Sequence, residues 1–290
     1  GTDAAGTGEA VLLPCGMQLK TYAFLRSLGR RGIHTIVASE LERNPLTASR
    51  YCDESITLDA APQDVVGYKD DLLAIAGRED VRTIVPVREY DAFVLAKYRE
   101  EFEEVVSTVA PNSETLRRAH DRYRLAQAAE AADVPFAETR LLSAVDNWDE
   151  RVVIKPRYNL LTGDYVETVS DGYATEVKDV TFVSPGDDPD VAAVTARMNH
   201  DPVVQAFVPQ ERKILYTTLW YEGEPLATYQ HEQLRQNSWV GGGGVYRVST
   251  YSETVDDVAT RLLGHLDWHG LACIEYVKNA ETGEWTFLEI

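Results

Sequence analysis

Two glutamates stand alone inside apolar runs near the end of the 290-residue sequence. Glu275 follows the run 272–274, and Glu289 follows the run 285–288. A carboxylate in an apolar run costs free energy unless it is paired or bound to a metal. The two runs predict strands joined by a hairpin loop over 279–284, so both carboxylates would share one face and could bind one or two Mg²⁺ ions. Pairing of both glutamates with arginines across the sheet is the alternative.

A lysine at the end of a predicted strand is the next candidate. Lys155 follows the apolar run 152–154 and precedes Pro156. An ammonium group at a strand end can neutralise phosphate oxygens in a cleft. Only seven of the 28 basic residues are lysines. That rarity favours a functional lysine over one whose stem merely covers the edge of a strand.

The segment Tyr229–Ser249 carries a third group of candidates, namely His231, Arg235, Arg247 and the four glycines 241–244. Successive glycines allow the backbone to approach a ligand closely and offer N–H groups to an anion. The two arginines are suited to binding a substrate carboxylate. A flexible hairpin with surface arginines explains the same pattern equally well, so both interpretations stay open.

The first 111 residues alternate between short apolar runs and segments with helical spacing. The predicted strands cover residues 10–15, 34–39, 55–58, 83–87 and 105–110, and the predicted helices cover 18–31, 62–76 and 90–104. This alternation predicts an α/β fold with an open parallel sheet and helices on both faces. No G-x-G-x-x-G follows the first strand, which argues against a dinucleotide site.

The rest of the sequence predicts an α+β region with short, irregular strands. One capped helix is expected over 112–133, a short one ending at Met198, and another over 254–266. Strands are expected at 152–155, 165–168, 180–183, 203–208, 215–221, 227–231, 272–277 and 285–290.

Charge and cysteine content restrict the partners. Asp and Glu number 47 against 28 Lys and Arg, which gives a net charge of −19. Such a surface suits a high-salt cytoplasm, as in a halophile, although an ordinary acidic protein is the alternative. We expect no nucleic-acid partner, because a protein that binds nucleic acid needs clustered cations on its surface.

The sequence contains no apolar stretch of 18 residues, so we expect no membrane span. Three cysteines without metal-ligand spacing indicate buried free thiols at Cys15 and Cys273 and a cytoplasmic location.

Four segments in this order resemble the ATP-grasp superfamily, especially its carbamoyl-phosphate-synthase-like and D-aspartate-ligase-like branches. They are DRYRLAQAAEAADVPFAET from Asp121, VVIKPR at 152–157, VVQAFVPQE at 203–211, and GLACIEYV…WTFLEI at 270–290. The resemblance implies a pre-ATP-grasp α/β domain over 1–111, a small lid subdomain with its connecting helix over 112–204, and a C-terminal subdomain over 205–290.

The resemblance also implies roles for individual residues. Lys155 and Arg122 would contact phosphates, although a solvated helix arginine explains Arg122 as well. The adenine hinge would be formed by Gln205, Phe207 and Val208, with Glu211 accepting the ribose hydroxyls; a plain core strand is the alternative for this segment. Glu275 and Glu289 would bind Mg²⁺ next to the β- and γ-phosphates of ATP.

The sequence departs from the family pattern at two places. The last family motif continues as Glu-x-Asn-Pro-Arg, and the sequence stops at Ile290, one residue before that asparagine; we therefore expect the last metal-binding motif to be incomplete. D-Alanine ligases carry an arginine two residues before the first metal carboxylate, where this sequence has Cys273. An acyl-phosphate still needs a donor at its carbonyl oxygen. We therefore expect Arg235 or Arg247 to face Glu275 and Glu289.

The function implied is that of an ADP-forming carboxylate–amine ligase. ATP would phosphorylate a small-molecule carboxylate, and an amine or ammonia would displace phosphate from the acyl-phosphate. Two alternatives are carbamoyl-phosphate-synthase-like chemistry on carboxyphosphate or carbamate, and a regulatory module that binds ATP without turnover. The expected cofactors are ATP and Mg²⁺, and a homodimer is left open.

The charge balance leads to a prediction about salt. Self-repulsion among excess carboxylates should weaken at high ionic strength, so the melting temperature should rise between low and molar KCl. Thermal denaturation followed by circular dichroism measures this. A melting temperature that is unchanged or lower in molar KCl would rule out the high-salt interpretation and would not bear on the ATP site.

Overall fold

The computed structural model describes residues 9–16, 18–61, 63–237 and 243–290. These residues form two compact units. The first contains the chain up to Ser113 together with 160–176, and the second contains 114–159 and 177–290. Within the described ranges, no helix has the length and hydropathy needed to cross a bilayer.

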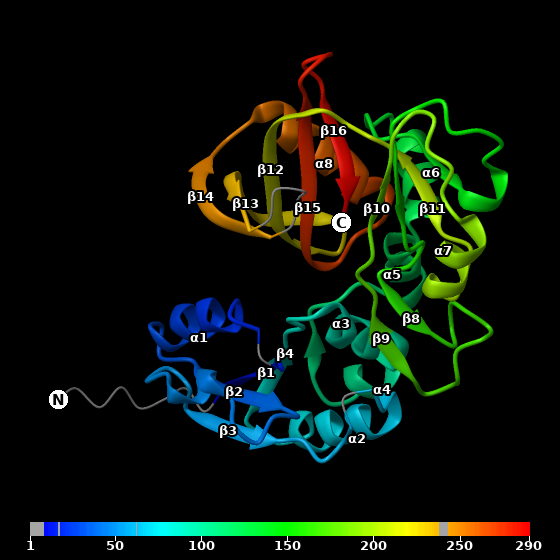
Figure 1. The fold of residues 1–290 in the computed structure, drawn as a ribbon. Helices are drawn as coiled ribbons and strands as arrows, with labels where there is room; N and C mark the ends of the chain where they lie inside the picture. The colour runs from blue at the N-terminus through cyan, green and yellow to red at the C-terminus, as the bar shows by residue number, and fades with distance from the viewer. Residues whose placement is uncertain (1–8, 17, 62, 238–242) are drawn as a thin grey trace. The chain divides into compact units, whose positions relative to one another are not determined.

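The first unit contains a parallel sheet in the order β3-β2-β1-β4-β5 (Figure 1). Its strands are β1 (Ala10–Pro14), β2 (His34–Ser39), β3 (Glu54–Thr57), β4 (Val81–Ile84) and β5 (Ser107–Thr108). Since β1 and β2 are apolar and buried almost throughout, both faces of the sheet must be covered. The predicted α/β class is confirmed.

Helices cover this sheet. They are α1 (Thr21–Gly29), α2 (Val65–Ala76), α3 (Glu89–Lys97) and α4 (Arg99–Glu103), with a 3₁₀ turn η1 (Pro45–Ala48). Leu25 of α1 packs in one apolar cluster with Leu13 and Val37. The helix predicted over 90–104 is in fact two helices, because the backbone leaves the helical region at Tyr98 (φ −109°, ψ 31°).

A short hairpin joins the first unit from later in the chain. It consists of β8 (Leu160–Thr162) and β9 (Ala174–Glu176), which pair with each other. The strand predicted at 165–168 is wrong: this segment lies in the turns between β8 and β9, where the amides of Tyr165 and Val166 both donate to the Thr162 carbonyl.

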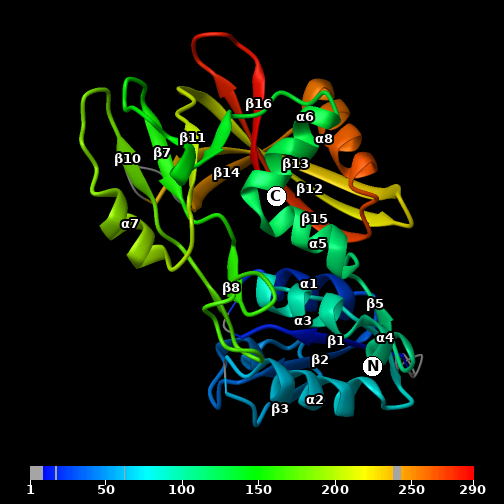
Figure 2. The same cartoon turned by 90° about the vertical axis from the view of Figure 1, so that its right-hand side faces the viewer.

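The second unit contains two antiparallel sheets (Figure 2). The smaller has the order β10-β7-β11-β6, and the larger β14-β13-β12-β15-β16. The strands are β6 (Thr139–Leu141), β7 (Val152–Lys155), β10 (Thr181–Val183), β11 (Val203–Ala206), β12 (Gln210–Tyr221), β13 (Glu224–Gln236), β14 (Gly244–Thr250), β15 (Gly270–Asn279) and β16 (Trp285–Glu289).

The helices of this unit include α5 (Ser113–His120), α6 (Arg122–Ala131), α7 (Val191–Met198) and α8 (Glu253–His265), with a 3₁₀ turn η2 (Leu142–Ala144). The single helix predicted over 112–133 is broken at Asp121. Its Oδ1 accepts hydrogen bonds from the amides of Tyr123 and Arg124 and so starts α6 as an N-cap.

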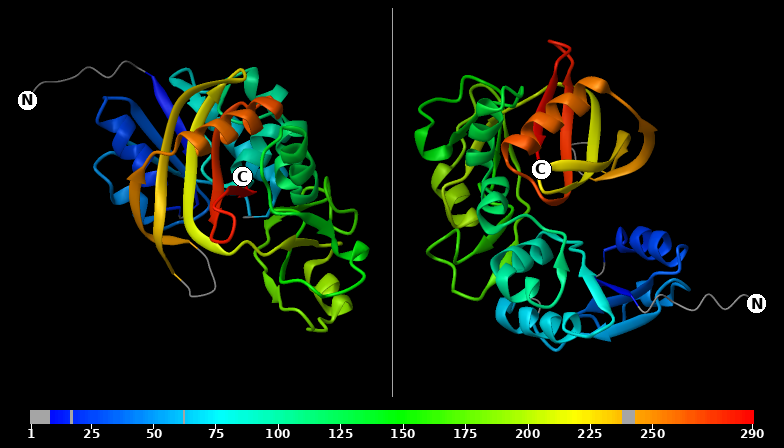
Figure 3. Two further views of the ribbon diagram at one scale, coloured as in Figure 1. Left: turned by 90° about the horizontal axis from the view of Figure 1, so that it is seen from above. Right: turned by 180° about the vertical axis from the view of Figure 1, so that it is seen from behind.

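The larger sheet has one apolar face and one face that carries charge. Ile214 and Tyr216 of β12 and Ile274 of β15 pack in one buried cluster with α8, which lies across the sheet (Figure 3). Side chains alternate along a strand, so Lys213 and Glu275 belong to the opposite face. Because of this alternation, Glu275 lies on the charged face of a sheet whose other face packs in the apolar core.

Cys273 shares that opposite face and is exposed, so the expectation of a buried thiol there is wrong. Cys15 is buried as expected, and burial, the largest cause, raises its pKa to about 11. At pH 8 only about one Cys15 in a thousand would then be a thiolate.

Iodoacetamide should therefore alkylate Cys273 well before Cys15 in the native protein at pH 8. Peptide mass mapping over a time course measures both rates. In guanidinium chloride, which removes burial, the two thiols should react at similar rates. Native reaction of Cys15 as fast as Cys273 would contradict the buried position.

Candidate functional site

Lys155 lies at the end of β7, in the middle of the smaller sheet. The preceding Val152 and Ile154 are buried in an apolar cluster with Val204 of β11. Lys155 Nζ donates to Gln205 Oε1 at 2.8 Å. The strand therefore fixes the lysine stem in place, and Gln205 holds its ammonium group.

Asp121 connects the end of β7 to the beginning of α6. Arg157 donates from Nε to Asp121 Oδ1 at 2.9 Å and from Nη2 to Oδ2 at 2.7 Å. Since Asp121 also caps α6, this bidentate pair fixes the first helical residue, Arg122, beside Pro156. The Arg122 amide donates to the Arg157 carbonyl at 2.8 Å, and its Nη1 donates to the Pro156 carbonyl at 2.7 Å.

The two glutamates lie opposite each other on β15 and β16, in register. Each is paired with a cation from another element. Lys213 Nζ lies 2.5 Å from Glu275 Oε2, and Arg122 Nη2 lies 3.3 Å from Glu289 Oε2. The Arg122 side chain is only 14% exposed, so Arg122 is not a solvated helix arginine.

The pKa directions show that these charges act on one another. Burial, the largest cause, raises the pKa of Glu275; Glu289 raises it further and Lys213 opposes both. Burial also acts to raise the pKa of Glu289, but Arg122 and Lys155 outweigh it and the pKa is lowered. Burial lowers the pKa of Lys155, and the two glutamates offset part of that effect. Lys155, Arg122, Lys213, Glu275 and Glu289 thus form one site, the charged cluster.

The charged cluster suits a metal–polyphosphate ligand. Three cations and two carboxylates give it a net charge of +1, which favours an anion. Arg122 Nε is buried and has no hydrogen-bond partner within the described ranges, so a donor remains for a phosphate oxygen. Within those ranges no third His, Cys, Asp or Glu completes a metal-binding group. The carboxylates fit Mg²⁺, which takes one or two of them and the rest of its ligands from phosphate and water.

A narrow cavity lies beside the charged cluster. It is lined by Arg122, Leu125, Ala126, Phe136, Ala137, Thr139, Gln205, Phe287 and Leu288. Its volume of about 10 Å³ holds roughly one water molecule. Six of the nine lining residues are apolar, which suits a flat ring, but such a ring could enter only if the walls moved apart.

The other predicted hinge residues lie along the chain that leaves β11. The Phe207 ring is covered by the Arg151 guanidinium, whose carbon lies 3.7 Å from the ring centroid, and the Phe207 amide donates to the Arg151 carbonyl. Val208 follows it. Glu211, on β12, pairs with Lys278 at 3.1 Å. The structure brings Gln205 to the charged cluster and shows no contact of Glu211 with it among the described residues.

The third group of candidates lies further along the larger sheet. His231 is buried on β13 in register with Leu215, which is itself in register with Glu275. Burial lowers the pKa of His231, and Arg247 lowers it further. Of the four glycines, 241 and 242 lie outside the described residues.

Neither Arg235 nor Arg247 lies within ion-pair distance of Glu275 or Glu289 in the described part of the chain. Both arginines are exposed. Because strands lie about 4.8 Å apart, β13 and β14 are separated from β15 by roughly 10 and 14 Å. Lys213, on the intervening strand β12, is the cation that pairs with Glu275. The expected role of Arg235 or Arg247 toward the substrate stays a prediction.

Lys213 is the residue that the sequence analysis missed. Two signals pointed to it. It is one of only seven lysines, and its position in the strand puts it on the opposite face from the core residues Ile214 and Tyr216. Predicting strand β12 from 215 instead of its true start at Gln210 left Lys213 outside any element.

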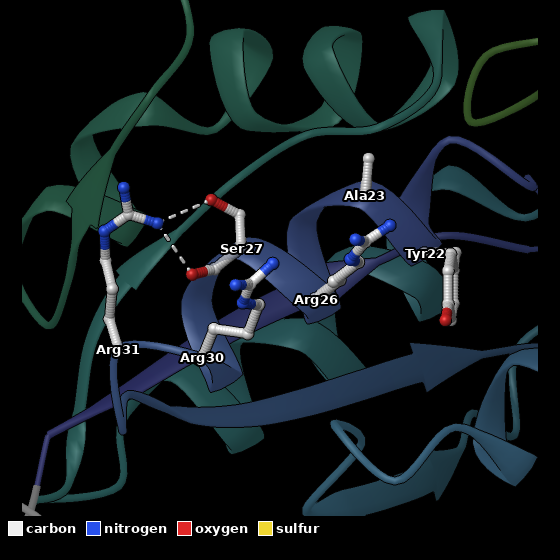
Figure 4. Close-up of a pocket in the computed structure, with 6 residues that line it drawn as sticks. All are labelled: Tyr22, Ala23, Arg26, Ser27, Arg30 and Arg31. Carbon is white, nitrogen blue, oxygen red and sulfur yellow. Dashed lines mark hydrogen bonds between the residues drawn. The ribbon is translucent and has the colours of Figure 1, made fainter.

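A larger hollow, of about 580 Å³, lies along α1 in the first unit. Figure 4 shows the side chains that line it, Tyr22, Ala23, Arg26, Ser27, Arg30 and Arg31, with an Arg31 nitrogen donating to the Ser27 carbonyl and hydroxyl at 2.9 Å. It contains none of the predicted site residues. We therefore place the candidate site at the charged cluster.

Comparisons with known proteins give fold-level likeness. No family model and no curated protein matches the chain. Among solved structures, N5-carboxyaminoimidazole ribonucleotide synthetase from Thermotoga maritima has a TM-score of 0.64 at 17% identity, covering 97% of this chain and 68% of that one. L-Amino acid ligase from Bacillus licheniformis has a TM-score of 0.68 at 13% identity, covering 97% and 66%.

A third match is the biotin carboxylase domain of Hydrogenobacter thermophilus 2-oxoglutarate carboxylase, in complex with MgADP, ADP and bicarbonate. It has a TM-score of 0.63 at 12% identity and covers 97% of this chain and 63% of that one. The chain spans about two thirds of the length of these three structures. None of the comparisons supports a high-salt source, which stays a prediction.

The Lys213–Glu275 pair makes a stability prediction. Lys213→Met should lower the free energy of unfolding by about 1–3 kcal/mol, because it leaves a largely buried carboxylate, 23% exposed, without its cation. Urea denaturation measures this. Adding Glu275→Gln should restore part of the loss, since the uncompensated charge is then removed.

Lys278→Met is the matched control, because its partner Glu211 is 46% exposed. Exposed pairs contribute only about 0–1 kcal/mol. If Lys213→Met destabilises the protein no more than Lys278→Met, burial does not strengthen the Lys213–Glu275 pair and the prediction is wrong.

Proposed function

Because the chain has the ATP-grasp fold, we propose that it is an ATP-dependent ligase whose nucleotide site is the charged cluster of the second unit. The reaction we propose joins a carboxylate to an amine or ammonia and forms ADP and phosphate. The observation that carries the proposal is the convergence of Lys155, Lys213 and Arg122 on the carboxylates of Glu275 and Glu289.

The proposed reaction has two steps. A carboxylate oxygen of the substrate attacks the γ-phosphorus of ATP, the bond from that phosphorus to the β–γ bridging oxygen breaks, and ADP leaves. The amine nitrogen then attacks the acyl carbon, the bond from that carbon to the phosphate oxygen breaks, and the nitrogen releases a proton. The chain needs no covalent nucleophile, so its contribution is positioning and charge neutralisation.

Each member of the charged cluster has a role in this proposal. Lys155 and Arg122 bind phosphate oxygens, and the buried Nε of Arg122 is a donor ready for one of them. Glu275 and Glu289 would hold Mg²⁺, which would supply Lewis-acid neutralisation of the β- and γ-phosphates. Lys213 compensates Glu275, and we assign it the further role of meeting charge that develops on the acyl oxygen.

The base and ribose are assigned to the hinge. The narrow cavity beside Gln205 and Leu288 would receive adenine once its walls part. Within the described ranges the Val208 amide donates to no backbone carbonyl, so it remains available to a ring nitrogen. Glu211 keeps its proposed role with the ribose hydroxyls, for which it would exchange part of its exposed pairing with Lys278.

Bicarbonate is a second candidate for the acid that is phosphorylated, because one solved structure with a similar fold is a complex with MgADP, ADP and bicarbonate. ADP release stimulated by bicarbonate alone would favour carboxyphosphate chemistry. Release that requires an organic acid would favour the ligase. Binding of ATP without ADP release under any of these conditions would favour a regulatory module.

The proposal predicts a loss of nucleotide affinity. Lys155→Ala should weaken Mg-ATP binding at least 10-fold, because a charge-assisted contact contributes about 1.5–3 kcal/mol. Isothermal titration calorimetry measures the dissociation constant. Glu275→Gln and Glu289→Gln should chiefly abolish Mg-dependent ADP release in a coupled assay with a panel of amino acids and small acids.

Lys69→Ala is the control, since Lys69 pairs with Asp70 and Glu101 in the first unit. It removes the same charge from the protein and should leave Mg-ATP affinity unchanged. If Lys155→Ala binds Mg-ATP as tightly as the parent and Lys69→Ala, the phosphate assignment is wrong.

A further inference from the structure

A row of arginines lies along the exposed face of α1 in the first unit. Arg26, Arg30 and Arg31 line the hollow of about 580 Å³, and Tyr22 lines it with them. Figure 4 shows the arginines in sequence along the helix, with Arg31 toward one end of the hollow and Tyr22 at the other. Sites for small molecules have volumes of about 300–1,000 Å³, so the hollow has room for one.

Arg26 and Arg30 have unused hydrogen-bond donors. Within the described ranges, neither guanidinium group forms an ion pair or a side-chain hydrogen bond. Arg78 and Arg88 of the same unit are each paired with carboxylates. In a chain with 47 acidic and 28 basic residues, cations without such a partner call for an explanation.

The end of the helix explains only part of this row. Arg31 donates from Nη1 to the Ser27 carbonyl and hydroxyl, both at 2.9 Å, and so satisfies an acceptor in the last turn of α1. The helix dipole also favours a cation in this turn, where Arg26 lies. Arg26 and Arg30 are four residues apart, however, and like charges at this spacing repel each other. An anion bound between them would remove that repulsion.

Arg50 adds positive charge beside the same end of α1. The Tyr51 ring packs against the helix, since a Cβ on Gly29 would lie 2.9 Å from it. Arg50 Nη2 donates to the Tyr51 hydroxyl at 2.6 Å. This hydrogen bond is the largest cause that lowers the pKa of Tyr51, and the charges of Arg26 and Arg30 lower it further. The positive charges therefore act on one small region of the surface.

The geometry of the row suits phosphate groups. A phosphate group has three terminal oxygens and can accept from two guanidinium groups, whereas one carboxylate matches a single guanidinium fork. Side chains four residues apart on a helix have their Cβ atoms about 5–6 Å apart, so Arg26 and Arg30 can both reach one phosphate. The remaining nitrogens of Arg31, or the Tyr22 hydroxyl, can then donate to a second phosphate.

We propose that the hollow along α1 binds a small molecule with two or more linked phosphate groups, held mainly by Arg26 and Arg30. A long polyanion such as a nucleic acid is disfavoured, because the chain as a whole has a net charge of −19. None of the lining residues belongs to the charged cluster, so this proposal does not rest on the proposed function.

Inorganic pyrophosphate is the probe. Citrate is its matched control, because it carries a similar charge on carboxylates. Binding is measured by titration calorimetry at constant ionic strength, without Mg²⁺ or nucleotide. Pyrophosphate should bind the parent protein at least about 10-fold more tightly than citrate and should raise its melting temperature.

Three results with the parent protein would overturn the proposal. Equal affinities for pyrophosphate and citrate would mean general attraction of anions. No binding of pyrophosphate up to about 10 mM would mean that the hollow holds no phosphate. Tighter binding of a hexaglutamate peptide than of pyrophosphate would instead make the row a docking surface for an acidic protein segment.

Arg26→Gln and Arg30→Gln should each weaken pyrophosphate binding about 3- to 10-fold, and the double variant more than 10-fold. The ligand-free variants should keep or gain melting temperature, because the repulsion between the two arginines is relieved. Arg82→Gln is the control, since Arg82 is 61% exposed in the same unit and does not line the hollow. It removes the same charge and should leave the affinity unchanged. Equal losses in Arg82→Gln and Arg26→Gln would overturn the assignment.

Lys155→Ala separates this site from the charged cluster. If Lys155→Ala abolishes pyrophosphate binding and the double variant does not, the pyrophosphate binds at the charged cluster and the present proposal is wrong. Mg-ATP affinity should be unchanged in the double variant. The two proposals therefore fail separately. Normal Mg-ATP affinity in Lys155→Ala removes the nucleotide assignment, and normal pyrophosphate affinity in the double variant removes only the site along α1.

Discussion

The repulsion between Glu275 and Glu289 is the constraint on which the candidate site depends. Like charges directly opposite on neighbouring strands are unfavourable, and partial burial makes them more so. Three elements supply the compensation: Lys213 from β12, Arg122 from the start of α6, and Lys155 from the end of β7. The three cations therefore compensate the charge of the two carboxylates. The same three cations could neutralise the oxygens of a polyphosphate.

The arrangement depends in turn on Asp121. One of its oxygens caps α6 and also accepts from Arg157, while the other accepts from Arg157 and lies 3.6 Å from Arg124 Nε. A single carboxylate thus sets the start of the helix that carries Arg122 and the end of the strand that carries Lys155. The chain has a net charge of −19, yet it forms a site with more cations than carboxylates, because Asp121 places the basic side chains locally.

Sequence reasoning found the strands that bear the chemistry and missed where helices break. The strands 152–155 and 285–289 were predictable because each is an apolar run that ends abruptly at a charged residue, Lys155 or Glu289. The breaks at Tyr98 and Asp121 were not, since apolar spacing continues across them and only a capping side chain marks the second. Spacing also does not reveal the register that brings Lys213 to Glu275.

The narrow cavity beside Gln205 and Leu288 has an energetic consequence. With room for about one water molecule, its walls lie against each other in this conformation. In the function proposed above adenine binds here, so a nucleotide would have to replace those contacts before it gains its own, and the closed state would compete with adenine for the same surface. The observed affinity is then the intrinsic affinity multiplied by the fraction of molecules that are open. Substitutions that loosen these walls, far from any phosphate contact, would therefore tighten nucleotide binding while lowering stability.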